Sequence, residues 1–178
     1  MKLKDKLPSF NELAPVYGVI SLFVYTWTIL WFFWKLNGWL VYLNLGEIGV
    51  ILVYSLATNL LECLFVLMIP LLISVVLPAR WYLDHFTASS TAWLLPGLSF
   101  VIFAAFQFEG RSKFHQSLII QVGIPVIFLM AFFIFATIKW QWARTLLESI
   151  ADRTTIFIYL FFPISVVSIV VVLIRNFL

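Results

Sequence analysis

The most constraining feature of this sequence is a series of five long apolar segments separated by short, more polar stretches. A bilayer core about 30 Å thick is crossed by about 20 residues of helix, and each segment is of about that length or longer. Lipid cannot hydrogen-bond to the backbone, so the segments must be helices or strands of a closed barrel. Barrel strands would be alternating runs of about ten residues, and these runs are longer and continuous. The segments are residues 15–34, 49–77, 92–108, 118–138 and 155–174.

The pattern therefore predicts an all-α, polytopic integral membrane bundle with five transmembrane helices joined by short loops, in a single membrane domain covering residues 1–178. The composition agrees, because 63% of the residues are hydrophobic and 11% are charged, against roughly 25% charged in soluble domains. The net charge of +3 is scattered and includes no basic, aromatic-interleaved motif. We therefore expect contact with the lipid bilayer and no nucleic-acid partner.

The connections carry their own patterns. Residues 140–153 place apolar side chains on one face of a helix and charged ones on the other, which predicts an amphipathic segment on the membrane surface. The alternative is an ordinary polar connector between two spans. The polar run 87–91 precedes the third segment and can supply its N-cap. The second segment is longer than a bilayer is thick, so it must tilt, protrude or bend, and Pro70 is the expected bend.

Lysine and arginine positions predict the orientation, because they are enriched in cytoplasmic loops. The first apolar segment is longer than the core of a signal peptide, and we expect it to be retained as a helix. A cytoplasmic N-terminus then places the C-terminus on the opposite side. It also places seven basic residues inside and four outside. The inner residues are Lys2, Lys4, Lys6, Arg80, Lys139, Arg144 and Arg153, and the outer ones are Lys35, Arg111, Lys113 and Arg175.

No sequence motif specifies a reaction. Cys63 is the single cysteine, which excludes intrachain disulfides and cysteine-ligated clusters. His85 and His115 fall in loops that the predicted topology places on opposite faces of the membrane. No nucleotide-binding, hydrolase or metalloprotease motif is present. The sequence therefore predicts a protein that is not an enzyme, with no catalytic, cofactor-binding or metal-binding residues and no cofactor.

Glu62 is the residue that calls for an explanation, since it lies well inside the second apolar segment. A charge at the centre of a bilayer costs at least about 2.5–3.5 kcal/mol on insertion scales. We therefore expect Glu62 to be protonated, hydrogen-bonded or in contact with water. Other polar residues follow helical spacing beside it and in the first segment, and the two rows are expected to face each other. This candidate intramembrane polar cluster is Ser55, Thr58, Asn59, Glu62, Tyr17, Ser21, Tyr25 and Thr28.

Two functions remain open for such a cluster. Interhelical hydrogen bonds would make it structural, in a non-enzymatic accessory or scaffold subunit of a larger membrane assembly. The alternative is a small oligomeric channel or transporter in which Glu62 titrates or contacts an ion. The first needs a membrane-protein partner and the second a homo-oligomer. In both cases Glu62 and Asn59 are expected to point into the bundle, within reach of the hydroxyls on the first segment.

Overall fold

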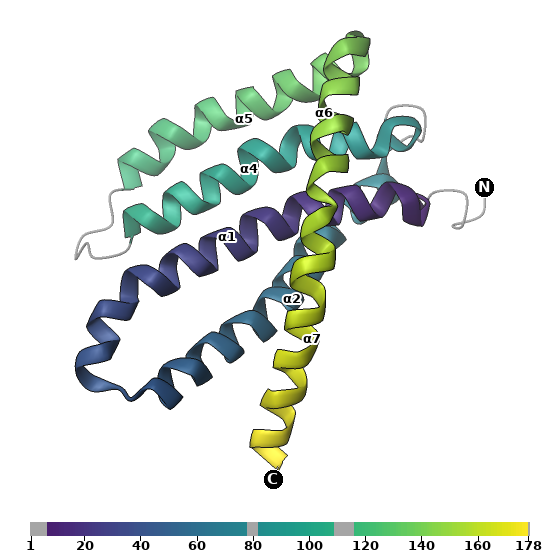
Figure 1. Cartoon of the computed structure of the whole chain (residues 1–178). Helices are drawn as coiled ribbons and strands as arrows, with labels where there is room; N and C mark the ends of the chain where they lie inside the picture. The colour runs from purple at the N-terminus through teal and green to yellow at the C-terminus, as the bar shows by residue number, and fades with distance from the viewer. Residues whose placement is uncertain (1–6, 78–81, 109–115, 178) are drawn as a thin grey trace.

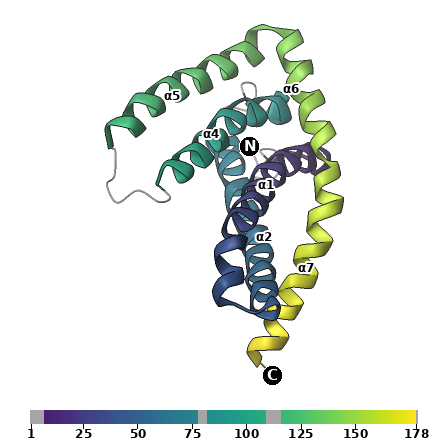
Figure 2. The ribbon, with the colours of Figure 1, turned by 60° about the vertical axis from the view of Figure 1, so that its left-hand side comes forward.

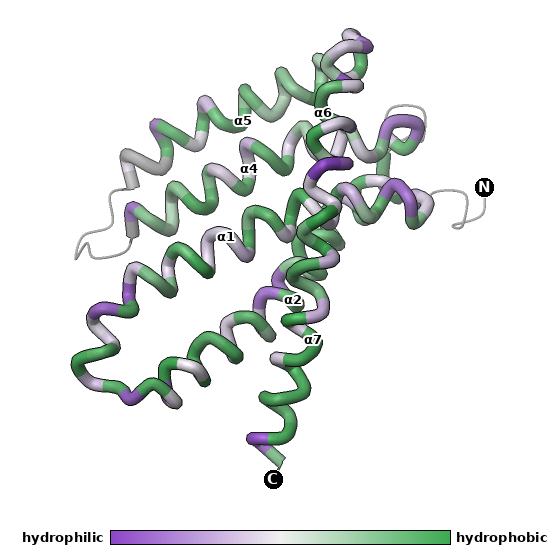
Figure 3. Tube along the Cα trace, in the orientation of Figure 1, coloured by the Kyte–Doolittle hydropathy of each residue, from purple (hydrophilic) through white to green (hydrophobic). Residues whose placement is uncertain are grey.

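The computed structural model describes residues 7–77, 82–108 and 116–177, and these residues are helical almost throughout (Figure 1). They contain no strand, so the predicted all-α fold is confirmed. Five helices are long and apolar enough to cross a bilayer, which is compatible with a multi-pass membrane protein. In Figure 3 apolar residues dominate these helices. The elements are α1 (Phe10–Tyr42), α2 (Leu45–Val76), the short 3₁₀ helix η2 (Leu83–His85), α4 (Phe86–Phe108), α5 (Gln116–Lys139), α6 (Gln141–Thr154) and α7 (Ile156–Phe177).

The first two helices begin before their apolar segments, and both have capping pairs at their N-termini. The Glu12 carboxylate accepts a hydrogen bond of 2.7 Å from the backbone N–H of Ser9. Asn44 and Glu47 form a reciprocal pair, in which each side chain accepts from the backbone N–H of the other at 2.9 and 2.8 Å. Such boxes satisfy N–H groups that a helix start leaves unpaired. α1 and α2 are 33 and 32 residues long, and a two-residue turn joins them.

The N-cap role predicted for residues 87–91 is wrong. α4 begins at Phe86, so the polar run lies inside the helix, and Ser89, Ser90 and Thr91 are buried. Ala88 and Ala92 of the same turns pack against Leu147 of α6. Small side chains let two membrane helices approach closely, and those of this run lie where α4 approaches α6.

α1 is the central helix and packs against α2, α4, α6 and α7. Its buried residues Val16, Ile20 and Tyr25 form the main core with Cys63 of α2 and Phe161 of α7. α5 packs mainly on α4 and α6 and lies at the edge of the bundle (Figure 2). Because α1 is central, each groove along it is formed with a different set of neighbouring helices.

α6 is amphipathic as predicted, but much of its apolar face contacts protein. Ala143, Leu147 and Ala151 are buried, and α6 packs on α4 and α1. Trp142 and Leu146 are exposed and remain available to lipid. The predicted topology also used residues 1–6, 80, 111, 113 and 115, which lie outside the described part of the chain.

Candidate functional site

The structure divides the predicted polar cluster into two groups, and the first lies in the core. The Tyr25 hydroxyl is 2.6 Å from the Ser165 hydroxyl of α7, and the Tyr25 ring stacks on Phe161 with centroids 4.3 Å apart. The Ser21 hydroxyl donates to the Cys63 sulfur at 4.0 Å. Tyr17 is half-buried beside this core. Tyr25 therefore joins α1 to α7, and the polar row of α2 is not its partner.

The second group joins α1 to α2 near the middle of both helices. The Thr28 hydroxyl donates to Asn59 Oδ1 at 2.9 Å, so the predicted hydrogen bond between the two rows is confirmed at this pair. Asn59 is 3% exposed. Its Nδ2 has no hydrogen-bond partner. A buried amide N–H without an acceptor costs about 1–3 kcal/mol, so this atom marks a position where an acceptor is missing.

The remaining hydroxyls of the α2 row are bonded within their own helix. Ser55 donates to the Ile51 carbonyl at 2.8 Å and Thr58 to the Tyr54 carbonyl at 2.9 Å. Both bonds follow the i to i−4 pattern by which serine and threonine satisfy themselves in membrane helices. Neither hydroxyl bridges to α1.

Glu62 is exposed, so the prediction that it points into the bundle is wrong. No described residue forms a hydrogen bond or ion pair with it. The reason is geometric, because residues three apart on a helix differ in direction by about 60°. Asn59 faces the α1 interface, and Glu62 lies at its rim. The face of α2 on which the spacing places Asn59 and Glu62 is wider than the strip of α2 that contacts α1.

Three open grooves meet along α1 at Trp27. The first, of about 470 Å³, lies between α1 and α2 and contains most of the second polar group. It is lined by Trp27, Thr28, Trp31, Val50, Ile51, Tyr54, Ser55, Thr58, Asn59 and Glu62. The second, of about 300 Å³, is bounded by α1, α2 and α4 and is lined by Phe23, Val24, Trp27, Glu62, Phe65, Val66, Leu98, Val101 and Ile102.

The third groove, of about 700 Å³, lies between α1 and α4. It is lined by Trp27, Leu30, Trp31, Trp34, Ser99, Ile102, Phe103 and Phe106. Trp27 lines all three grooves, and Glu62 lines the first two. We call the surface formed by the three grooves the Trp27 face. It is long, concave and aromatic, with a single carboxyl group at the junction of two grooves.

The tryptophans of this face were not among the predicted site residues. Trp27, Trp31 and Trp34 suggest, on sequence, the aromatic belt of a span end. The structure places them instead along grooves beside the polar group. The sequence does contain a signal for this placement. Trp27 is adjacent to Thr28, and Trp31 is one turn from it on the same helix.

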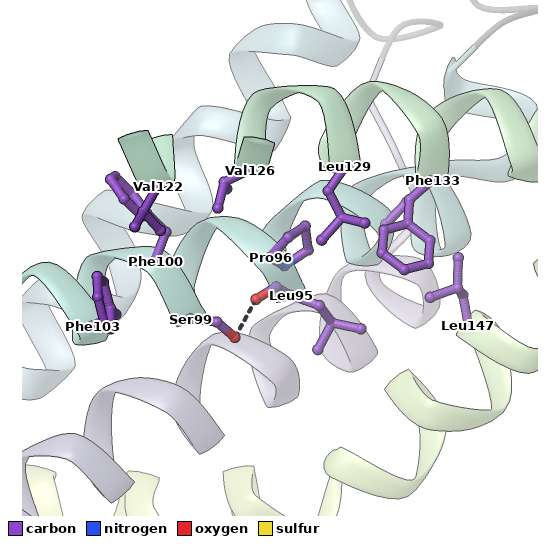
Figure 4. Close-up of a pocket in the computed structure, with 11 residues that line it drawn as sticks. Leu95, Pro96, Ser99, Phe100, Phe103, Val122, Val126, Leu129, Phe133 and Leu147 are labelled. Carbon is purple, nitrogen blue, oxygen red and sulfur yellow. Dashed lines mark hydrogen bonds between the residues drawn. The ribbon is translucent and has the colours of Figure 1, made fainter. Parts of the chain in front are cut away.

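Two other grooves are almost purely apolar. One, of about 360 Å³, lies between α4 and α5 and is lined by Leu95, Phe100, Val126, Leu129 and others (Figure 4). Its hydroxyl, on Ser99, donates to the Leu95 carbonyl at 2.7 Å. The other, of about 630 Å³, lies where α2, α4 and α5 diverge. Such surfaces suit acyl chains and offer little to a polar ligand.

Among the described residues, no group of three His, Cys, Asp or Glu side chains could hold a metal ion. The Trp27 face is thus the one described surface where an aromatic lining, a buried unpaired amide and an exposed carboxyl occur together. No protein-family model, curated protein or solved structure matches the chain.

Proposed function

We propose that this chain is a non-enzymatic subunit of a larger membrane assembly, and that its Trp27 face binds a transmembrane helix of a partner protein. The observation that carries the proposal is the position of Glu62, which is exposed near the middle of α2 and has no partner among the described residues. A carboxyl group against acyl chains is costly. A partner helix would cover it and remove that cost.

Two further features support a protein partner over lipid. The groove between α1 and α2 is lined by the hydroxyl oxygens of Ser55 and Thr58, whose remaining acceptor capacity acyl chains cannot use. The face also presents Trp27, Trp31 and Phe65, and large aromatic side chains are enriched where proteins bind each other. Lipid tails are as apolar as leucine, so polar groups of this kind supply specificity for a helix.

The chemistry of the face supports a role without catalysis. Its described polar groups are one amide, one carboxyl, the indole N–H groups of three tryptophans and hydroxyls that donate within the chain. No base stands beside a nucleophile among them, as covalent catalysis would require.

We further propose that the N-terminus is cytoplasmic and the C-terminus lies on the other side. Five spans require opposite sides for the two ends, and the lysine and arginine distribution favours this direction. The start of α1 and the end of α7 lie at different ends of the molecule in Figure 1, which supports an odd number of spans.

A small channel or transporter is the second candidate. It is favoured by the exposure of both Thr58 and Glu62, which lie one turn apart on α2. In a symmetric homo-oligomer joined through the Trp27 face, these groups would recur around the axis and could contact an ion. The two functions differ in whether the covering helix comes from another protein or from a second copy.

Purification from native membranes in mild detergent, followed by mass spectrometry, tests the choice. We expect co-purification of a different membrane protein at a fixed ratio. Thr58→Trp fills the groove from an exposed position and should abolish this co-purification. Ile127→Trp, on the exposed side of α5, is the matched control and should retain it. A homo-oligomer that survives without other chains would favour the channel. Equal effects of the two substitutions would refute the assigned face.

A further inference from the structure

We infer that the partner helix contributes a basic side chain, a lysine ammonium or an arginine guanidinium, which binds at Glu62 on the Trp27 face. This inference rests on the proposed function, because it specifies the chemistry of the partner at the same site. It follows from the hydrogen-bonding state of the groove, from its aromatic walls and from the position of the Glu62 carboxyl.

The hydroxyl groups of the groove between α1 and α2 can only accept hydrogen bonds from a ligand, because their protons are already used. Thr28 donates to Asn59, and Ser55 and Thr58 donate to backbone carbonyls of α2. Tyr54 donates to Asn176 Oδ1 at 3.0 Å. Each hydroxyl oxygen keeps acceptor capacity after its proton is used. Together with the Glu62 carboxyl, these oxygens favour a ligand that donates several hydrogen bonds, and ammonium and guanidinium groups are such donors.

The aromatic lining favours the same class of ligand. Trp27, Trp31 and Tyr54 line the groove that contains Glu62, and the faces of indole and phenol rings attract cations. α1 already shows this interaction on the same row of tryptophans, since Lys35 Nζ lies 5.7 Å from the centroid of Trp31 and 5.4 Å from that of Trp34. A carboxylate among aromatic rings is suited to a cation.

Asn59 has an N–H donor that is not engaged and lies in the same groove as Glu62. Its Nδ2 belongs to a side chain that is 97% buried and lines that groove, one turn from Glu62. It does not bond to Glu62 in this structure, and a side-chain rotation that joined the two would stabilise the charged carboxylate. A partner cation would then bind the carboxylate from the open side, where a charge-assisted hydrogen bond is roughly twice as strong as a neutral one.

Designed transmembrane peptides test this without knowledge of the natural partner. The probes are Leu-Ala helices of about 23 residues, long enough to span a bilayer, with Lys, Gln or Leu at the central position. Binding to the purified full chain is measured by fluorescence energy transfer in phosphatidylcholine vesicles, after circular dichroism has shown that each peptide inserts as a helix. The protein variants are Glu62→Gln and, as a matched loss of one negative charge away from the face, Asp152→Asn of α6.

We expect the Lys peptide to bind about tenfold more tightly than the Gln and Leu peptides, as one charge-assisted pair would provide. Glu62→Gln should abolish this preference, and Asp152→Asn should keep it. Equal binding of the Lys and Gln peptides would overturn the inference, and so would a preference that survives Glu62→Gln. Because the three peptides are also compared on the unaltered chain, that comparison does not depend on whether a variant folds.

Failure here is distinguishable from failure of the proposed function. If a partner co-purifies and is lost with Thr58→Trp while the Lys peptide shows no preference, the subunit role stands and its basic contact is refuted. If the Lys preference holds but no partner depends on the face, the subunit role is refuted and Glu62 remains a cation site.

Discussion

At the scale of single residues, the polar groups of this chain have different tasks although they share one spacing. Tyr25 and Thr28 lie one turn apart on α1, yet the first bonds to α7 and the second to α2. Ser55 and Thr58 bond within α2, and Glu62 bonds to none of the described residues. The periodic pattern predicts that these residues share a face. It does not predict which neighbour each one meets, because that depends on how the helices cross.

The buried bond between Tyr25 and Ser165 gives the first prediction. Tyr25→Phe keeps the ring that stacks on Phe161 and removes the hydroxyl, so the loss should be that of one interhelical bond, about 0.6 kcal/mol and at most about 1.7. Tyr159→Phe is the control, because Tyr159 is 78% exposed and should lose nothing. Reversible unfolding in detergent micelles measures both. Equal stabilities for the two variants would contradict the assigned bond.

Thr28 and Glu62 should respond in opposite ways in the isolated chain. Thr28→Val removes the hydroxyl that donates to Asn59 and should lower the free energy of unfolding by about 0.6–1.7 kcal/mol. Glu62→Leu removes an exposed carboxyl group that has no bonds, so it should leave stability unchanged or raise it. The same unfolding assay applies to the chain purified without other proteins. Destabilisation by Glu62→Leu there would show that Glu62 has a bond within its own chain.

At the scale of elements, the helix spans follow from the sequence because lipid requires continuous apolar helices. The early starts of α1 and α2 were not predicted, since they lie at the capping pairs of Ser9 and Asn44 and outside the apolar segments. The Trp27 face was not predicted either, because no local pattern indicates that α2 and α4 flank the same side of α1. A close approach of helix backbones was equally hidden. It occurs where Gly18 of α1 meets the junction of α6 and α7.

That crossing gives the third prediction. A Cβ at residue 18 would lie 2.8 Å from the carbonyl carbon and oxygen of Thr154, and backbone atoms cannot rotate away as a side chain can. Gly18→Ala should therefore destabilise the bundle by about 1–3 kcal/mol. Gly38→Ala in the same helix has no atom within 4 Å of the new Cβ. It should cost nothing and gain up to about 1 kcal/mol from helix propensity. Equal thermal unfolding of the two variants would refute the close crossing.

At the scale of the whole molecule, the described helices form a bundle with a dense region and several open grooves, three of which make up the Trp27 face. The dense region surrounds the start of α1, where α4, α6 and α7 converge on small side chains. The three grooves of the Trp27 face follow the later part of α1 between α2 and α4. We interpret this asymmetry as a stable anchor that presents a binding surface within the membrane.

The fourth prediction concerns orientation. Reporter domains fused to the two ends should show opposite sidedness, because five spans separate the ends in the proposed topology. The N-terminal reporter should be in the cytoplasm, because the lysine and arginine distribution favours that direction. Enzymatic reporters that are active on one side of the membrane measure this in intact cells. Reporters on the same side would mean an even number of spans and would refute the five-span topology.

The central claim is that a partner helix covers the Trp27 face, and photo-crosslinking in native membranes tests it most directly. A benzoylphenylalanine is placed at Phe65, which lines the face, or at Phe128 on the edge helix α5. The two phenylalanines are matched, with exposed fractions of 69% and 72%. We predict that position 65 crosslinks to one different membrane protein and that position 128 crosslinks to lipid. Lipid adducts at both positions, or a crosslink from position 65 to a second copy of the chain, would contradict the account.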